Sequence, residues 1–318
     1  MTRVGMTPPP LVEVRDLRVH FPVRRGVVRA VDGVSLTVPD GGSYGLVGES
    51  GGGKTTVGRA VLGLVAPTAG TVRFAGTDLG TLRGEPLRRL RRRVQPVFQD
   101  PLASFDPRHT LGAALAEAVH AHRPGPAAPR IHEALHAVGL GPDLLRRYPF
   151  ELSAGQCQRA GIARALVVAP DLVVADEPVS ALDAALRLQV LDLLHRLRTD
   201  RGLGYLLIAH DLAAVRHLAD VVGVLYLGVL VEQAGADALY AAPRHPYTRA
   251  LLSAVPVPDP DRPPPPVPLA GDPPSAADPP AGCRFHPRCP WARPTRCRDE
   301  VPALREVAPG HLVACHWA

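Results

Sequence analysis

The sequence has almost no lysine and no asparagine. Of its 36 basic residues, 35 are arginine, and the one lysine is Lys54. This bias most simply reflects the base composition of the coding DNA, so by itself it excludes no structure. It makes the exception informative, because a compact and flexible ammonium can enter a tight phosphate-binding loop that a planar guanidinium does not fit.

Long apolar runs are missing as well. The longest, at about residues 221–231, is well short of the roughly 20 residues that a membrane-spanning helix needs, which excludes such a helix. The first residues, 1–7, are followed by three prolines and do not read as a signal peptide. We therefore expect a cytoplasmic protein, in which the five cysteines serve as thiols or metal ligands and not as disulfides.

The net charge of +6 permits contact with an anionic membrane surface or with nucleic acid, but charge alone cannot choose between them. The basic run at residues 88–93 directly precedes an apolar strand. We expect it to form a solvated helix face and not a nucleic-acid patch. The length of 318 residues suits one large domain with an appendage, or two domains.

Lys54 lies in a segment that fits the pattern G-x-x-x-x-G-K-[S/T], between the apolar run 43–47 and a helix predicted over residues 56–65. The backbone N–H groups of such a loop, together with the helix N-terminus, surround phosphate oxygens. Lys54 would reach the β- and γ-phosphates, and Thr55 would bind Mg²⁺. The predicted nucleotide contacts here are Gly48, Glu49, Ser50, Gly51, Gly52, Gly53, Lys54, Thr55 and Thr56.

Residues 11–40 alternate apolar and polar side chains between turn signals, which predicts an antiparallel β-layer ahead of the phosphate loop. Phe21 is the candidate for an aromatic ring that stacks on adenine. A phenylalanine in the core of a strand is an equally good interpretation of this residue.

Polar side chains follow three further apolar runs. Gln99 follows residues 94–98, Asp176 and Glu177 follow 172–175, and His210 follows 205–209. Because open α/β sheets build their sites at the carboxyl ends of strands, we expect these side chains to meet. Asp176 would hold Mg²⁺ with Thr55 and Gln99, and the predicted catalytic residues are Glu177, which would polarise the attacking water, His210 and Gln99.

Between these strands, residues 101–165 read as a helical insertion. It contains the segment Leu152-Ser153-Ala154-Gly155-Gln156, which opens a helix with Ser153 as its N-cap. A capped helix start is a second anion site, for which we predict Ser153, Gly155 and Gln156 as contacts. A further polar segment, residues 180–183, follows the carboxylate pair and ends at Asp183.

These motifs, in this order, resemble the nucleotide-binding subunit of ABC transporters over about residues 11–240. The resemblance implies an α/β P-loop NTPase fold and an ATPase that uses ATP and Mg²⁺. It also implies a head-to-tail dimer, expected to be a heterodimer with a second ABC ATPase subunit. In that dimer Ser153, Gly155, Gln156 and Asp183 would contact the nucleotide held by the partner. The segment 152–156 resembles the signature sequence of the family but departs from it at Ala154, where a glycine is usual, and the added methyl could weaken that contact.

Beyond a short N-terminal tail at 1–10 and the nucleotide-binding domain at 11–240, three segments remain. Residues 241–256 are similar to a segment of ATPase subunits from dipeptide, oligopeptide and nickel importers. The similarity implies two membrane permease subunits, an extracytoplasmic solute-binding protein as an indirect partner, and a peripheral location on the cytoplasmic face of the membrane. A proline-rich linker is predicted at 257–280, and a small cysteine-rich extension at 281–318.

Four cysteines in the extension are separated by 5, 7 and 17 residues, which is not the C-x₂-C spacing of a zinc ribbon. Four thiolates could hold a four-iron four-sulfur cluster, as some related importer subunits do, or zinc. Four partly buried thiols in a small cap are an equal alternative. The candidate ligands are Cys283, Cys289, Cys297 and Cys315, with His286 and His316 as substitutes for a missing ligand.

Two other functions stay open at this point. The first is a soluble ABC-type ATPase that acts on nucleic acid or ribosomes, favoured only by the basic charge; such proteins usually have two ATPase domains or a coiled coil, and this chain shows one domain without heptads. The second is a degenerate regulatory nucleotide-binding subunit, which Glu177 and His210 argue against. We expect no nucleic-acid partner.

Overall fold

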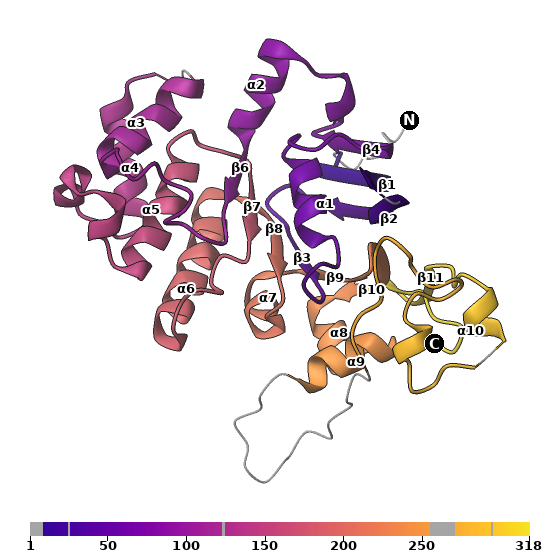
Figure 1. The fold of residues 1–318 in the computed structure, drawn as a ribbon. Coiled ribbons are helices and arrows are strands. Elements are labelled where there is room, and N and C mark those ends of the chain that lie inside the picture. Colours follow the sequence, from indigo (N-terminus) through magenta and orange to yellow (C-terminus); the bar gives the residue numbers. More distant parts are fainter. Residues whose placement is uncertain (1–8, 25, 123–124, 255–270, 294) are drawn as a thin grey trace, which may run out of the picture.

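The protein was analysed as a computed structural model that describes residues 9–24, 26–122, 125–254, 271–293 and 295–318. Most of the predicted N-terminal tail and linker lies outside the described residues. Figure 1 shows an α/β body whose central sheet runs from a helical lobe at one end to the C-terminal extension at the other. In the described residues the eight-stranded sheet has the order β11-β12-β10-β9-β3-β8-β7-β6, and a four-stranded sheet has the order β2-β1-β4-β5.

The parallel part of the large sheet is covered on both faces. Its strands are β3 (Ser43–Val47), β6 (Val94–Val97), β7 (Leu172–Asp176), β8 (Gly204–Ala209) and β9 (Val221–Tyr226). They are almost continuously apolar, as expected for strands that are buried on both sides. Because side chains alternate between the faces of a strand, β8 sends Tyr205 and Leu207 into one core cluster and Leu206 and Ile208 into the other.

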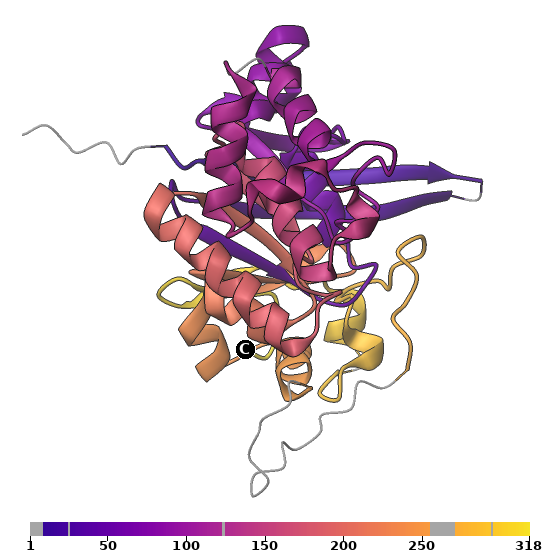
Figure 2. The ribbon, with the colours of Figure 1, turned by 90° about the vertical axis from the view of Figure 1, so that its left-hand side faces the viewer.

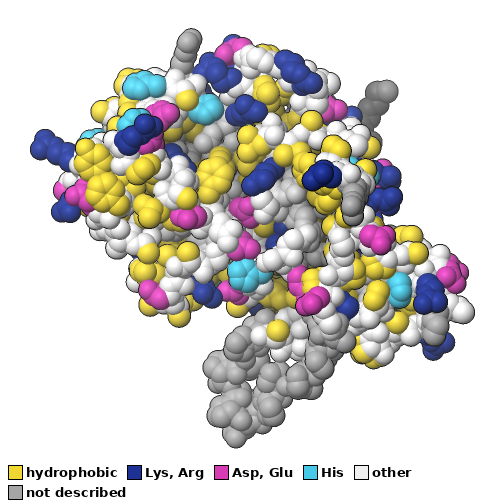
Figure 3. Space-filling view, in the orientation of Figure 1, with side chains coloured by type: hydrophobic (Ala, Val, Ile, Leu, Met, Phe, Trp, Pro, Cys, Tyr) yellow, Lys and Arg dark blue, Asp and Glu magenta, His cyan; other side chains and the backbone are white. Residues whose placement is uncertain are grey.

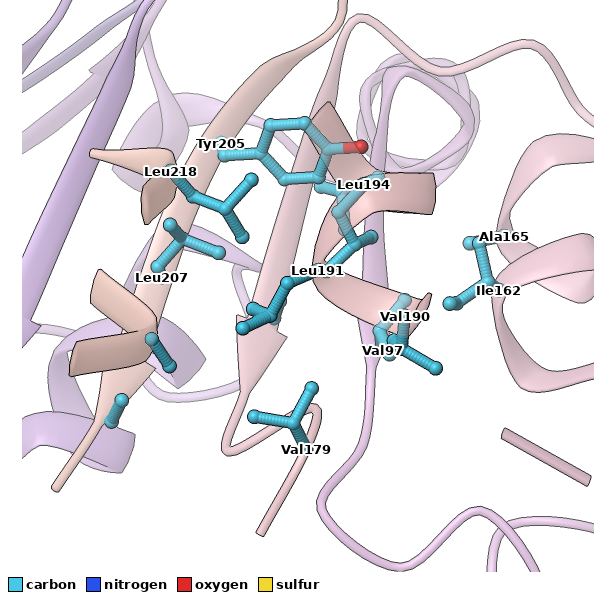
Figure 4. Close-up of a cluster of buried hydrophobic side chains, with 14 of the residues drawn as sticks. Val97, Ile162, Ala165, Val179, Val190, Leu191, Leu194, Tyr205, Leu207 and Leu218 are labelled. Atoms are coloured by element: carbon cyan, nitrogen blue, oxygen red, sulfur yellow. The ribbon is translucent and has the colours of Figure 1, made fainter. Parts of the chain in front are cut away.

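Figure 4 shows part of the first cluster. Tyr205 and Leu207 of β8 lie against Leu191 and Leu194 of α6 (Ala184–Arg201), while Ile162 of α5 (Ala154–Leu166) approaches from the neighbouring helix. On the opposite face, α1 (Lys54–Val61) packs against β7 and β8. These contacts hold the loops at the carboxyl ends of β3, β7 and β8 in fixed relative positions.

The antiparallel layer forms as the alternation predicts. The long strands β1 (Val12–Val23) and β2 (Gly26–Val38) pair with each other, and β1 also pairs with β4 (Ala69–Phe74), followed by the short β5 (Thr77–Asp78). Figure 2 shows the β1–β2 hairpin projecting from the body. This layer places β2 beside the phosphate loop.

The helical lobe lies at the β6 end of the sheet (Figure 1) and contains α3 (Leu111–His122), α4 (Ala127–Ala137) and the start of α5. The basic run belongs to α2 (Gly84–Arg93), and its arginines are engaged within the protein. Arg88 and Arg89 pair with Glu85, and Arg93 pairs with Asp171. Arg89, Arg91 and Arg93 are nevertheless exposed, so the run forms a solvated helix face, as expected.

The C-terminal extension is part of the large sheet, although its sequence predicts a separate cap behind a linker. Strand β10 (Val229–Gly235) pairs with β12 (His311–Val313), which pairs in turn with β11 (Arg305–Ala308). The carboxylate of Glu232 on β10 is fully buried and lies 2.7 Å from Nε2 of His311. Three short helices belong to the same part of the chain: α8 (Ala236–Ala241), which packs against β10, α9 (Pro246–Ser253) and α10 (Arg296–Asp299).

Candidate nucleotide-binding and hydrolysis site

The phosphate loop joins β3 to α1, with the helix starting at Lys54, two residues before the predicted start. Gly48, Gly51 and Gly53 have φ angles of 150°, 76° and 98°, which L side chains rarely adopt. A Cβ atom on Gly53 would lie 2.0 Å from the carbonyl oxygen of Ala30 on β2. Glycine is therefore required at this position both by backbone conformation and by the close approach of β2.

Lys54 is buried inside its own loop. Its Nζ donates to the carbonyl oxygens of Gly48 at 2.8 Å and Glu49 at 2.9 Å. Burial lowers the pKa of Lys54, and the nearby carboxylates of Glu177, Asp176 and Glu49 partly offset this effect. The ammonium thus has acceptors on the loop and lies within the electrostatic reach of both carboxylates that follow β7.

The polar residues at the strand ends meet as predicted. Nε2 of Gln99 donates to Oε2 of Glu177 at 2.9 Å, and Nδ1 of His210 lies 3.1 Å from Oε1 of the same carboxylate. Glu177 has a φ of 47°, an uncommon conformation for a residue with a side chain. Its N–H donates to the carbonyl oxygen of Ile208 at 2.7 Å, a contact that holds this backbone conformation beside β8.

Asp176, the last residue of β7, faces Thr55, the second residue of α1. Oγ1 of Thr55 donates to Oδ1 of Asp176 at 3.2 Å. Burial raises the pKa of Asp176, as does the charge of Glu177, whereas the bond from Thr55 and the charge of Lys54 act in the opposite direction. A hydroxyl and a carboxylate beside a phosphate site are the oxygen ligands that Mg²⁺ prefers, so these residues fit the ion.

A cavity of about 520 Å³, a size typical of small-molecule sites, is lined by Thr55 and Glu177 but not by Asp176. Its lining includes loop residues 50–54 and the three side chains Gln99, Glu177 and His210. Ala276, which belongs to the described part of the predicted linker, also lines it. The predicted site residues that line the cavity are Ser50, Gly51, Gly52, Gly53, Lys54, Thr55, Thr56, Gln99, Glu177 and His210.

Phe21 does not line this cavity. It pairs with Val28 across the β1–β2 hairpin, and it is Val28, with Ala30, that forms the wall. The phenyl ring is 40% exposed, so the core interpretation of Phe21 is also not met. Its contact with adenine stays a prediction.

The second predicted anion site lies apart from the cavity, on the helical lobe. Ser153 caps α5 by accepting from the N–H of Gln156 at 3.2 Å, and the Gln156 side chain accepts from the N–H of Ser153 at 3.0 Å. Asp183 caps α6 in the same way, through the N–H groups of Ala185 and Leu186. Ser153, Gly155, Gln156 and Asp183 are absent from the lining of the cavity that contains Lys54.

The four cysteines of the extension are free thiols, with Cys297 buried and the other three partly buried. Burial raises the pKa of Cys283 to about 11, and the other three thiols lie near enough to add to this effect. In the ranges that the structure describes, no group of three or more His, Cys, Asp or Glu side chains is arranged to hold a metal ion. His286 and His316 bond to backbone carbonyls. Of the two equal interpretations of these cysteines, the described residues therefore support the four partly buried thiols and do not support a cluster or zinc site.

Sequence reasoning missed the residues behind the phosphate loop. The hydroxyl of Tyr247 accepts a 2.7 Å bond from the N–H of Glu49, and the Arg288 guanidinium binds the Glu49 carboxylate. Tyr247 and Arg288 lie 198 and 239 residues from Glu49 in the sequence. A buried aromatic cluster of Tyr226, Tyr247 and Phe285 supports both contacts.

The structure has the parts of a nucleotide-hydrolysing cassette. These are a phosphate loop between β3 and α1, a carboxylate pair at the end of β7, and a helical lobe. Comparison with known families agrees: residues 31–180 match the model of the ABC transporter family, and residues 231–297 match the C-terminal region of oligopeptide/dipeptide transporters. A putative peptide import ATP-binding protein of Brucella ovis is 51% identical over 98% of both chains. The oligopeptide transport ATP-binding protein AppF of Bacillus subtilis is 47% identical over 96% of this chain and 97% of its own.

The chain therefore belongs to the ABC transporter ATP-binding proteins, within the group that carries the oligopeptide/dipeptide C-terminal region. The ATP-binding cassette MJ0796, solved as a dimer in a post-hydrolysis state with ADP and phosphate, superposes with a TM-score of 0.64 at 26% identity. The match covers 71% of this chain and 98% of MJ0796. These findings confirm the predicted fold and an ATPase of the ABC transporter class.

In the described ranges, every helix is too short or too polar to cross a bilayer. On the face shown in Figure 3, Lys and Arg side chains are spread over several elements with acidic side chains among them. This face therefore does not carry a continuous basic stripe of the kind that tracks a nucleic-acid backbone.

Proposed function

We propose that this protein is one ATPase subunit of a peptide importer and works at the cytoplasmic face of the membrane with a second ATPase subunit and two permease subunits. An extracytoplasmic solute-binding protein would deliver the peptide. The full-length similarity to proteins named for peptide import supports the substrate class. The matched C-terminal region of oligopeptide/dipeptide transporters supports it independently.

The observation that carries the catalytic part is the Glu177 carboxylate, held between Gln99 and His210 on the wall of the cavity that contains Lys54. In this proposal the phosphate loop binds the triphosphate and Lys54 neutralises its β- and γ-phosphates. Glu177 orients and deprotonates the attacking water, while His210 and Gln99 fix the carboxylate. Thr55, Asp176 and Gln99 would hold Mg²⁺, which supplies charge neutralisation at the phosphates.

The position of Ser153, Gly155 and Gln156, away from the cavity that contains Lys54, supports a two-subunit site. These residues lie at the N-terminus of α5, where Ser153 is exposed and Gly155 is buried, and the N-terminus of a helix favours an anion. In a head-to-tail dimer they would cover the nucleotide of the partner, with Asp183 near the shared boundary. We propose a heterodimer, in which the methyl group of Ala154 weakens the site held by the partner.

The test is the variant Glu177→Gln in the full chain, assembled with its partner ATPase and permeases. Removal of the base should lower steady-state hydrolysis by about 100-fold or more while ATP binding persists. The control is Glu85→Gln, which alters an exposed carboxylate on α2 and should hydrolyse at the parental rate. Undiminished hydrolysis by Glu177→Gln would refute the assignment of the base.

Transport is tested separately, in vesicles that contain the assembled complex and the solute-binding protein. Uptake of a labelled peptide should require internal ATP and should be lost with Lys54→Ala. ATP-dependent uptake of nickel but not of peptides would overturn the substrate class and leave the ATPase assignment intact.

A further inference from the structure

The C-terminal extension contacts both walls of the nucleotide cavity. On the β2 side, the N–H of Arg29 donates to the carbonyl of Ala276 at 3.1 Å, and Ala276 itself lines the cavity. Further along β2, Arg284 binds Asp32 and the carbonyl oxygen of Leu227. The extension therefore supports the strand whose residues Val28 and Ala30 form one side of the cavity.

On the loop side, the contact is a two-point ion pair. Nη1 and Nη2 of Arg288 donate to the Glu49 carboxylate oxygens at 2.8 and 3.1 Å. The side chains of Arg288 and Glu49 are 6% and 26% exposed, so solvent screens this pair far less than a surface pair. Tyr226, whose hydroxyl lies 3.4 Å from Nη1, packs on the same guanidinium.

Glu49 links this ion pair to the phosphate loop. Its carbonyl oxygen accepts from Nζ of Lys54 at 2.9 Å and from the N–H of Gly52 at 3.2 Å. Its own N–H donates to Tyr247. The backbone of Glu49 is thus bonded to Lys54 and to the loop, while its side chain is bonded to the extension.

The charge of Glu49 is unfavourable at this place. A carboxylate within a loop that binds a triphosphate repels the substrate unless a cation neutralises it, and the partly buried position strengthens that repulsion. Arg288 supplies this cation from the C-terminal extension, 239 residues away from Glu49 in the sequence.

We propose that Arg288 is a positioning residue for ATP binding. It acts through Glu49: it neutralises the carboxylate and holds the loop in the conformation that leaves Lys54 facing the cavity. The extension is by this route a determinant of ATP affinity. The proposal rests on the assignment of the Lys54 loop as the nucleotide site.

The experiment measures the affinity of the purified full chain for MgATP by titration calorimetry. Arg288→Ala should weaken binding about tenfold, because the Glu49 carboxylate would then repel the triphosphate and the loop would be held less firmly. Arg288→Lys should restore part of the loss. In a Glu49→Gln background the same Arg288→Ala change should cost less than about twofold, because the charge that it neutralises is gone. Arg296→Ala is the matched control, since it removes an exposed arginine of the extension that pairs with Glu300.

In the assembled complex, Arg288→Ala should raise the KM for ATP by a similar factor and leave kcat nearly unchanged, because Arg288 does not touch the reacting groups. An equal loss of affinity in the parental and Glu49→Gln backgrounds would reduce Arg288 to a general structural role and overturn the proposal, as would unchanged binding. If Arg288→Ala does not fold, the comparison of Arg288→Lys in the two backgrounds decides in the same way. Lys54→Ala tests the nucleotide site separately from the role of Arg288. Full ATP binding by that variant would refute the nucleotide site itself.

Discussion

His245 makes a specific prediction about stability in acid. Its side chain is 1% exposed, and burial lowers its pKa from 6.5 to about 3. Nδ1 accepts a 3.1 Å bond from the N–H of Tyr247 at the start of α9. A protonated ring would place a donor against this donor, so the folded protein requires the neutral form.

The direction of the pH dependence of stability follows from the pKa of His245 in the unfolded and the folded protein. Between pH 6.5 and pH 3 the unfolded chain binds a proton at His245 that the folded protein does not, so stability is present above pH 6.5 and is lost as the pH falls through this window. Each pH unit inside the window costs about 1.4 kcal/mol, and the fall from pH 7 to pH 5 costs about 2 kcal/mol from this residue.

The assay is urea denaturation of the full chain at pH 7, 6 and 5, compared with His245→Asn. Asparagine keeps a side-chain acceptor at the helix N-cap but does not titrate, so the variant is less stable at pH 7 and loses about 2 kcal/mol less between pH 7 and 5. His132→Asn, which changes an exposed histidine on α4, is the control and should follow the parent. Parallel losses in the parent and in His245→Asn would refute this reasoning.

Two further predictions concern the nucleotide site. Gly53→Ala should lower ATP affinity by at least about tenfold, because its methyl group would meet the Ala30 carbonyl at 2.0 Å, whereas Gly51→Ala adds a methyl to open space and bears only the strain of its φ of 76°; equal ATP titrations of the two variants would contradict this. If the Phe21 ring stacks on adenine, Phe21→Ala should weaken ATP binding by about 1–3 kcal/mol, whereas Val23→Ala, on the same exposed part of the hairpin, should not. Matching affinities for Phe21→Ala and the parent would exclude the stacking contact.

The parts of the site that depend on local sequence could be predicted. A glycine-rich turn between an apolar strand and a helix has few alternative structures, and the carboxyl ends of parallel strands must lie along one edge. The contacts of Gln99 and His210 with Glu177 follow from that geometry. The catalytic edge was thus within reach of the residue pattern, although the assigned chemical roles still await the experiments described above.

The contribution of the extension could not be predicted. Strands β11 and β12 have four and three residues, too few for a readable alternation, and β12 pairs with β10 at a separation of about 80 residues. The Arg288–Glu49 pair spans 239 residues and joins two types that are common on surfaces. Only the three-dimensional path of the chain reveals that these side chains meet. Proline-rich composition suggested a tether to an independent cap, but it carries no information about where the chain re-enters the sheet.

The addition of β12 to the edge of β10 also limits how such a chain can be shortened. A protein truncated before residue 281 would lose β12 and expose the hydrogen-bonding edge of β10. The buried Glu232 carboxylate would also lose His311, and its remaining donors would be the N–H groups of Arg244 and His245. Such a fragment is expected to self-associate through that edge. A shortened version of this chain must therefore either retain the extension or have β10 redesigned for contact with water.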